Sequence, residues 1–212
     1  LSSHGPIIGQ EFLYLKVRTS SVQDSGGIID YSKNLQEVLR TTDWTPVELL
    51  ADKMLDCWIN SKTVYFCGNG GSAGNAIHLA NDFLYGIANE TGKGLKVHAL
   101  PANAAIITCL GNDIGYDSIF SEQVAVYCEE SDLLIVLSGS GNSPNILKAL
   151  EQAKAKGVIT CAILGFSGGK AKNMADIVIH IPVDDMQIAE DLQVIIGHML
   201  MKYLKSIKEG NL

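Results

Sequence analysis

The sequence predicts an α/β protein with one parallel sheet that is covered by helices on both faces. Stretches compatible with helices lie between most of the predicted strands, and a long helix is expected at 188–208. Strands that are apolar throughout and alternate with helices are typical of parallel sheets buried on both faces. The apolar runs that predict the strands each end near Gly or Ser and lie at 64–67, 97–100, 133–137, 160–164 and 177–181.

Two helices are expected before the first strand. Apolar residues recur at helical spacing over 28–39, and a second amphipathic pattern runs over 45–60. Pro46 lies in the first turn of that second pattern, where proline is tolerated. Residues 1–27 are poorly patterned and are interpreted as an extension, in part a tag remnant. Residues 28–208 are then expected to form a single domain.

The composition is that of an ordinary globular protein. The 212 residues are 47% hydrophobic and 18% charged, with a formal net charge of −7. The acidic balance argues against a surface that coats nucleic acid, because such domains usually carry a basic face. No apolar run reaches the roughly 18 residues that a membrane helix needs, and no secretory signal is visible. The five cysteines are expected to be buried free thiols in a reducing compartment, so the protein is expected to be cytoplasmic.

The first loop that predicts chemistry is 67–75, Cys-Gly-Asn-Gly-Gly-Ser-Ala-Gly-Asn, between a strand and a helix. In parallel sheets, ligands bind beyond the carboxyl ends of the strands. Glycines let the backbone approach a ligand closely, and the N-terminus of a helix offers free N–H groups to an anion. The loop matches neither Gly-x-Gly-x-x-Gly nor a Walker loop, so a plain glycine-rich turn is the alternative.

The second loop is 138–145, Ser-Gly-Ser-Gly-Asn-Ser-Pro-Asn, after the most apolar strand. It holds three hydroxyls and a proline suited to a helix start. The only arginines are Arg18 and Arg40, so a later anion site must use backbone N–H groups, hydroxyls or lysine. The pattern favours a cradle for a phosphate monoester. A helix cap followed by a polar turn is the alternative.

Polar residues on otherwise apolar helices are the third signal. His78 and Asp82 are four positions apart, so they share one helical face and can meet one ligand or metal. Glu190 and His198 are eight apart, which separates them by roughly 12 Å along a helix. They can join one site only if that site is spread along the helix or is shared between chains.

Together these residues resemble the sugar isomerase (SIS) domain family, and within it the heptose-phosphate isomerase branch. The resemblance spans about 28–205. It implies a three-layer α/β sandwich with a five-stranded parallel, flavodoxin-like sheet, and a homotetramer with active sites between chains. The residues that carry it are 68–73, His78 with a carboxylate four positions later, 111–113 (Gly-Asn-Asp), 138–143, 168–170 (Gly-Gly-Lys) and His198.

The resemblance also implies a role for individual residues. Asp82 is expected to be the base and His198 its acid–base partner, moving a proton between C1 and C2 of a phosphosugar through an enediol. The implied zinc ligands are His78, Asp82, Glu190 and His198. The phosphosugar is expected to contact Asn69, Gly70, Gly71, Ser72, Asn103, Ser138, Gly139, Ser140, Asn142, Ser143 and Glu190.

The chain departs from the family pattern mainly around the sugar. Asp82 is one methylene shorter than the usual glutamate, and Glu190 in place of glutamine adds a negative charge that favours a divalent metal. The other departures are Gly86 for arginine, Asn103 and Gln187 for aspartates, and Gly139 for threonine. The leading interpretation is an aldose–ketose isomerase of sedoheptulose 7-phosphate. An enzyme acting on another phosphosugar and a non-catalytic SIS-domain binding or regulatory protein stay open as alternatives.

Overall fold

The computed structural model describes residues 26–207. The chain divides into two compact units, Leu1–Thr41 and Thr42–Leu212. The described part of the first unit is helix α2 (Gly26–Thr41), in which Arg40 donates two hydrogen bonds to Glu37, at 2.7 and 2.9 Å. The expected extension, 1–27, lies outside the described residues except at its last two positions, where α2 has already begun.

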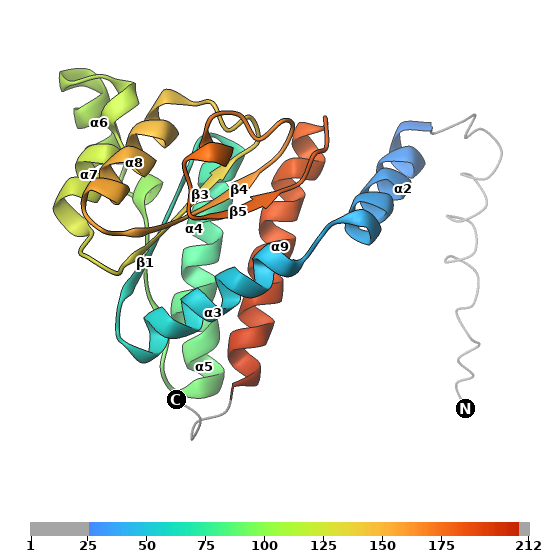
Figure 1. Ribbon diagram of the computed structural model, residues 1–212, viewed down its shortest axis with the longest axis horizontal. Coiled ribbons are helices and arrows are strands. Elements are labelled where there is room, and N and C mark those ends of the chain that lie inside the picture. The colour runs from blue at the N-terminus through green and yellow to red at the C-terminus, as the bar shows by residue number, and fades with distance from the viewer. Residues whose placement is uncertain (1–25, 208–212) are drawn as a thin grey trace, which may run out of the picture. The chain divides into compact units, whose positions relative to one another are not determined.

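The second unit is built on parallel strands in the order β2-β1-β3-β4-β5, which form a five-stranded sheet in the described part of the chain (Figure 1). This confirms the predicted fold class, and each strand agrees with its apolar run to within one residue at either end. Strand β3 is buried along its whole length, which explains its uninterrupted apolar sequence. The strands are β1 (Thr63–Gly68), β2 (Lys96–Ala99), β3 (Leu133–Ser138), β4 (Ile159–Leu164) and β5 (Ile177–His180).

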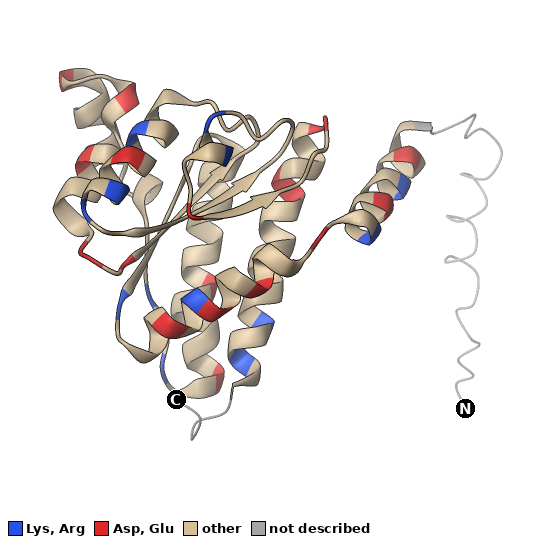
Figure 2. Cartoon of the chain, in the orientation of Figure 1, with Lys and Arg blue, Asp and Glu red and all other residues tan. Residues whose placement is uncertain are grey.

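Helices cover the sheet in two layers (Figure 1). One layer contains α3, α4 and α9, of which α3 and α4 contact the sheet and α9 packs against both of them. The other layer contains α7 and α8, which pack against each other. Acidic and basic residues are interspersed on the helices, whereas β3, β4 and β5 carry neither (Figure 2). The helices are α3 (Thr45–Ile59), α4 (Gly71–Asn81), α5 (Ile87–Thr91), α6 (Ala104–Asp113), α7 (Ser121–Tyr127), α8 (Pro144–Ala155) and α9 (Met186–Ser206). None of the described helices is long and apolar enough to cross a membrane.

All five cysteines are free, and four of them are buried as expected. Burial raises the pKa of Cys57 to about 11 and that of Cys128 to about 12, so these thiols stay protonated at neutral pH. Cys109 is the exception, because it lies on α6, a helix with no buried residue, and is exposed.

The strand order decides where a ligand can bind. The chain leaves β1 toward β2 on one side and returns to β3 on the other, so the direction of winding switches between β1 and β3. In the flavodoxin-like order the crevice beyond the carboxyl ends of the strands opens at this point. Gly68 at the end of β1 pairs with Leu137 of β3, so the glycine-rich and serine-rich loops leave the sheet side by side.

Candidate active site

The glycine-rich loop makes a tight connection between β1 and α4. A Cβ atom at Gly68 would lie 2.7 Å from the carbonyl oxygen of Ser72, and Gly70 has a φ of +56°. Both positions therefore require glycine. Ser72 is buried and its Oγ accepts a hydrogen bond of 3.0 Å from Gln193 Nε2. The first turn of α4 is in this way fixed to α9.

The serine-rich loop folds back on itself after β3. Ser138 Oγ accepts a hydrogen bond from the Gly141 N–H at 3.1 Å, and Ser140 Oγ accepts one from the Asn142 N–H at 3.3 Å. Ser143 is the N-cap of α8, yet its side chain makes no capping hydrogen bond. Its hydroxyl therefore serves no cap, which argues against the interpretation of this loop as a simple helix cap.

A third segment, 165–171, supports the serine-rich loop from behind. The Gly165 N–H donates to Gly139 O at 3.0 Å, and the Ala171 N–H donates to Gly141 O at 3.0 Å. His180 Nε2 lies 2.9 Å from Phe166 O, while its Nδ1 lies 3.1 Å from Lys172 Nζ. Since the carbonyl only accepts and the ammonium only donates, His180 carries its proton on Nε2. Nothing local in the sequence connects His180 with this loop, and it was not predicted.

The two loops enclose a pocket of about 260 Å³. None of the residues that line it is basic and one, Glu190, is acidic. The groups that can bind an anion here are therefore hydroxyls, the Asn69 amide and backbone N–H groups, as the scarcity of arginine predicts. The lining residues are Asn69, Gly70, Gly71, Ser72, Leu137, Ser138, Gly139, Ser140, Ser143, Met186 and Glu190.

Two expected phosphosugar contacts do not line this pocket. Asn142 accepts a hydrogen bond from the Lys170 N–H through Oδ1, at 3.1 Å, and so faces the supporting segment. Asn103 is the N-cap of α6 and lines a separate pocket of about 600 Å³ that also contains His98. The structure thus brings together all the other residues expected to contact the phosphosugar.

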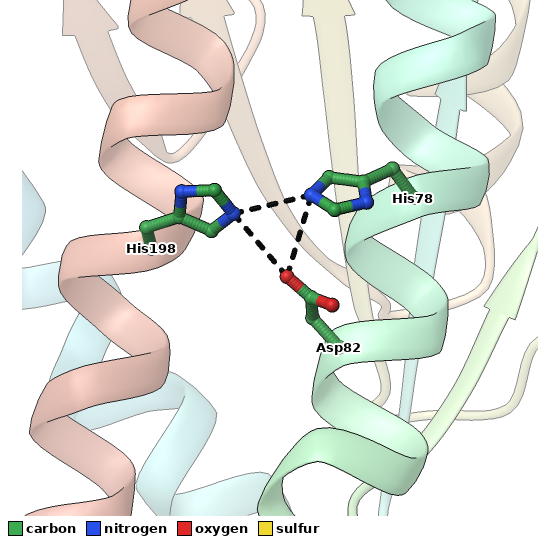
Figure 3. A group of neighbouring side chains, drawn as sticks. All are labelled: His78, Asp82 and His198. Atoms are coloured by element: carbon green, nitrogen blue, oxygen red, sulfur yellow. Dashed lines mark hydrogen bonds and ion pairs between the residues drawn. The ribbon is translucent and has the colours of Figure 1, made fainter. Parts of the chain in front are cut away.

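His78 near the end of α4, Asp82 directly after it and His198 in the middle of α9 point toward one another (Figure 3). Asp82 Oδ2 lies 3.4 Å from His78 Nε2 and 3.3 Å from His198 Nε2, and the two Nε2 atoms are 3.1 Å apart. The imidazoles are about half exposed, whereas the Asp82 side chain is 16% exposed. The short aspartate therefore still reaches both imidazoles.

The backbone explains how these side chains meet. Asp82 begins a π-helical turn, η1 (Asp82–Gly86), that continues α4. A Cβ atom at Gly197 would collide with the side chain of Leu79, so this glycine lets α9 approach α4 beside His198. At Gly86, a Cβ atom would collide with the Met201 side chain. A methionine thus fills space that the side chain of an arginine at this position would enter.

The cluster fits a metal ion. Two imidazole nitrogens and a carboxylate oxygen, all within 4.8 Å of one another, are donors that zinc accepts, and three protein ligands leave a fourth position open. Glu190 does not join them. Its carboxylate lies at Gly71, where a Cβ atom would collide with it. Glu190 and His198 are on the same helix, so two turns of α9 keep them apart.

Comparisons with known proteins agree with this architecture. Residues 29–165 match the family described as the SIS domain. A phosphoheptose isomerase of Fusobacterium nucleatum is 39% identical over 76% of this chain and 81% of its own length. One from Aneurinibacillus thermoaerophilus is 34% identical over 85% of this chain and 88% of its own length. The structure of a phosphoheptose isomerase from Francisella tularensis superimposes with a TM-score of 0.80 at 31% identity, covering 86% of this chain and 96% of that one.

Proposed function

Because the chain belongs to the SIS-domain family of phosphoheptose isomerases, we propose that it converts sedoheptulose 7-phosphate into an aldoheptose 7-phosphate. The observation that carries this proposal is the combination of a hydroxyl-lined pocket at the start of α4 with a His–Asp–His cluster at its end. The pocket suits the phosphate, which takes no part in the chemistry, and the cluster suits the proton transfers at the other end of the sugar.

Asp82 is proposed as the base. Its carboxylate removes the proton from C1 of the ketose and returns it to C2 of the enediol, while His198 takes the proton from O1 and supplies one to O2. Asp82 Oδ2 faces both imidazoles, and Oδ1 has only a 3.5 Å contact with Asn81 Nδ2. Oδ1 is therefore the oxygen that we assign to proton transfer.

His78, Asp82 and His198 are proposed as the ligands of a zinc ion. The ion would polarise the carbonyl of the substrate and stabilise the negative charge of the enediolate. Use of Oδ2 alone for the metal leaves the second oxygen of Asp82 as a base. Use of His198 Nε2 for the metal likewise leaves its Nδ1 for the proton transfer between the two oxygens, so each of these side chains can serve both purposes.

We propose that the protein is a homotetramer in which each site is shared between chains. Within one chain, the pocket at Gly71 and the cluster at His198 lie at opposite ends of the α4–α9 contact. Apolar side chains around the cluster are exposed, among them Ile77 (44%), Leu84 (52%) and Met199 (41%). A second copy that covers this face would bring its Glu190 toward the open metal position and its pocket toward the cluster.

Residues 28–208 are proposed as the SIS domain, since the family match begins at residue 29. A cytoplasmic location is proposed because the cysteines are free, which fits a reducing compartment.

The reaction is tested by NMR of sedoheptulose 7-phosphate incubated with the protein, with and without added zinc, in D₂O. New anomeric resonances of an aldose, with deuterium incorporated next to the carbonyl, are expected. An Asp82→Asn variant is the control for contaminating isomerases. Unchanged sugar with the zinc-loaded wild type would contradict the proposed function.

The shared site is tested by co-expressing Asp82→Asn with a Ser140→Ala/Ser143→Ala double variant, each with its own affinity tag. Oligomers that carry both tags are expected to be more active than either variant alone, because an intact pocket then faces an intact cluster. The assay uses substrate well below the KM of the wild type. No recovery in the mixed oligomers, or a monomer in light scattering, would contradict the shared site.

A further inference from the structure

Asn69 and Asn145 form a reciprocal pair of side-chain amides. Asn69 Nδ2 donates to Asn145 Oδ1 at 2.9 Å, and Asn145 Nδ2 donates to Asn69 Oδ1 at 2.8 Å. Asn69 belongs to the glycine-rich loop and lines the pocket, whereas Asn145 lies in the first turn of α8 and is only 1% exposed. The pair therefore joins the two loops that form the pocket.

Tyr116 adds a third hydrogen bond to this pair. It is the first residue of η3 (Tyr116–Ser118), and its hydroxyl donates to Asn69 Oδ1 at 3.1 Å. Lys148 of α8 donates to Ser118 Oγ at 3.3 Å, which holds η3 against α8. Tyr116 is 55% exposed, so the phenol reaches Asn69 from the surface.

The hydrogen-bonding capacity of Asn69 is then almost used up. Its Oδ1 has two lone pairs, and these accept from Asn145 and Tyr116, while one of its two Nδ2 hydrogens goes to Asn145. The remaining N–H points away from Asn145, as in any reciprocal amide pair. Rotating the Asn69 amide alone by 180° would oppose oxygen to oxygen and nitrogen to nitrogen, so the pair ties the orientation of this group to that of the buried Asn145 amide.

We propose that Asn145 and Tyr116 are positioning residues, which orient the amide of Asn69 so that it offers an N–H donor to an oxygen of the phosphosugar. This inference rests on the proposed function for the identity of the ligand. A donor favours phosphate and hydroxyl oxygens, which accept hydrogen bonds. Neither Asn145 nor Tyr116 is among the residues that line the pocket, so in this proposal each acts only through Asn69.

A double-mutant cycle tests this dependence. The dissociation constant of sedoheptulose 7-phosphate is measured by calorimetry for Asn69→Ala, Asn145→Ala and the double variant. Each single change is expected to weaken binding about tenfold, as for loss of one hydrogen bond to a charged group. The double variant is expected to bind as Asn69→Ala does. Independent losses that multiply to about a hundredfold would overturn the proposal, because Asn145 would then act through the fold.

Tyr116→Phe keeps the cycle informative if Asn145→Ala does not fold, because it removes one hydroxyl from an exposed ring. It is expected to weaken binding about threefold in the wild type and to have no effect in Asn69→Ala. An equal effect in both backgrounds would overturn the role of Tyr116. Asn60→Ala is the matched control, because the Asn60 side chain hydrogen-bonds to Asp56 and both residues precede β1, at the end of the strand opposite the pocket. This variant is expected to bind sedoheptulose 7-phosphate as the wild type does.

The same measurements separate this inference from the proposed function. Wild-type protein that binds sedoheptulose 7-phosphate without converting it contradicts the isomerase activity, and the cycle can still be read from binding. Conversion by the wild type together with multiplicative losses contradicts the positioning role alone. Wild-type protein that does not bind the sugar contradicts both.

Discussion

The pocket and the His–Asp–His cluster lie on the same two helices, but they are built in different ways. The pocket consists of loop backbone and short side chains at the ends of buried strands, and a network of backbone hydrogen bonds from 165–171 supports it. The cluster consists of three side chains on helix surfaces, and both imidazoles are about half exposed. Backbone that is already ordered binds without rearrangement, whereas exposed side chains need a ligand or a neighbour to fix them.

This difference indicates a division of labour between binding and chemistry. Changes in the cluster should remove catalysis and leave the phosphate bound, whereas changes in the pocket should weaken binding and leave the chemistry intact. The following five substitutions test that separation, from the largest expected effect to the smallest.

Asp82→Asn is expected to lower kcat by about a thousandfold, the contribution of a positioned general base, because an amide cannot take a proton from carbon. The dissociation constant of sedoheptulose 7-phosphate is expected to change less than about twofold, since the pocket is untouched. Turnover by NMR and binding by calorimetry give the two quantities. Full activity in this variant would show that another group is the base.

His78→Ala is expected to lose the metal and to lower kcat about a hundredfold, since a ligand that orients a catalytic ion has been removed. Elemental analysis of protein purified without chelator gives the zinc content, and the wild type prepared in parallel is the reference. His98→Ala is a matched control, because that imidazole stacks on Tyr65 and lies outside the cluster. A wild type without any divalent metal would contradict the zinc proposal and leave acid–base catalysis standing.

Gly197→Ala is expected to lower the free energy of unfolding by about 2 kcal/mol, because its methyl group would collide with Leu79 in a packed interface. The same collision moves His198 away from His78, so zinc affinity should fall more than sugar binding. Urea unfolding and zinc titration give the two measurements. If Gly197→Ala were as stable as the wild type, the α4–α9 contact would have to accommodate the methyl group without loss of stability.

Ser140→Ala and Ser143→Ala are each expected to weaken phosphosugar binding by about 1–2 kcal/mol, the cost of a lost hydrogen bond to a charged group. Their kcat values should stay near that of the wild type. Ser206→Ala removes a hydroxyl that donates to Tyr203 O at the end of α9 and serves as the control. Unchanged affinity in both pocket variants would remove the phosphate assignment.

The sequence predicts best those features that are contiguous along the chain. Each apolar run became a strand, and the two loops became the walls of one pocket, because a strand and the loop after it are encoded together. The roles of Asn145 and His180 depend on partners far away in the sequence, Asn69 and Phe166, and no local pattern indicates such contacts. Whether Glu190 reaches the metal through a second copy stays a prediction. Within one chain, the rigid spacing along α9 keeps Glu190 away from His198 and the rest of the cluster.

The π-helical turn at Asp82–Gly86 has a consequence for the side chains beside the cluster. A π-helical turn holds one residue more than an α-helical turn, so it is equivalent to a single inserted residue. The five residues of such a turn cover about the same rotation around the axis as four α-helical residues at about 100° each. Deleting one of them would restore an ordinary α-helix and leave His78, Asp82 and the helix after Gly86 in place. Only the side chains inside the turn would be redirected, so the length of this turn decides which groups stand beside the cluster without any substitution in it.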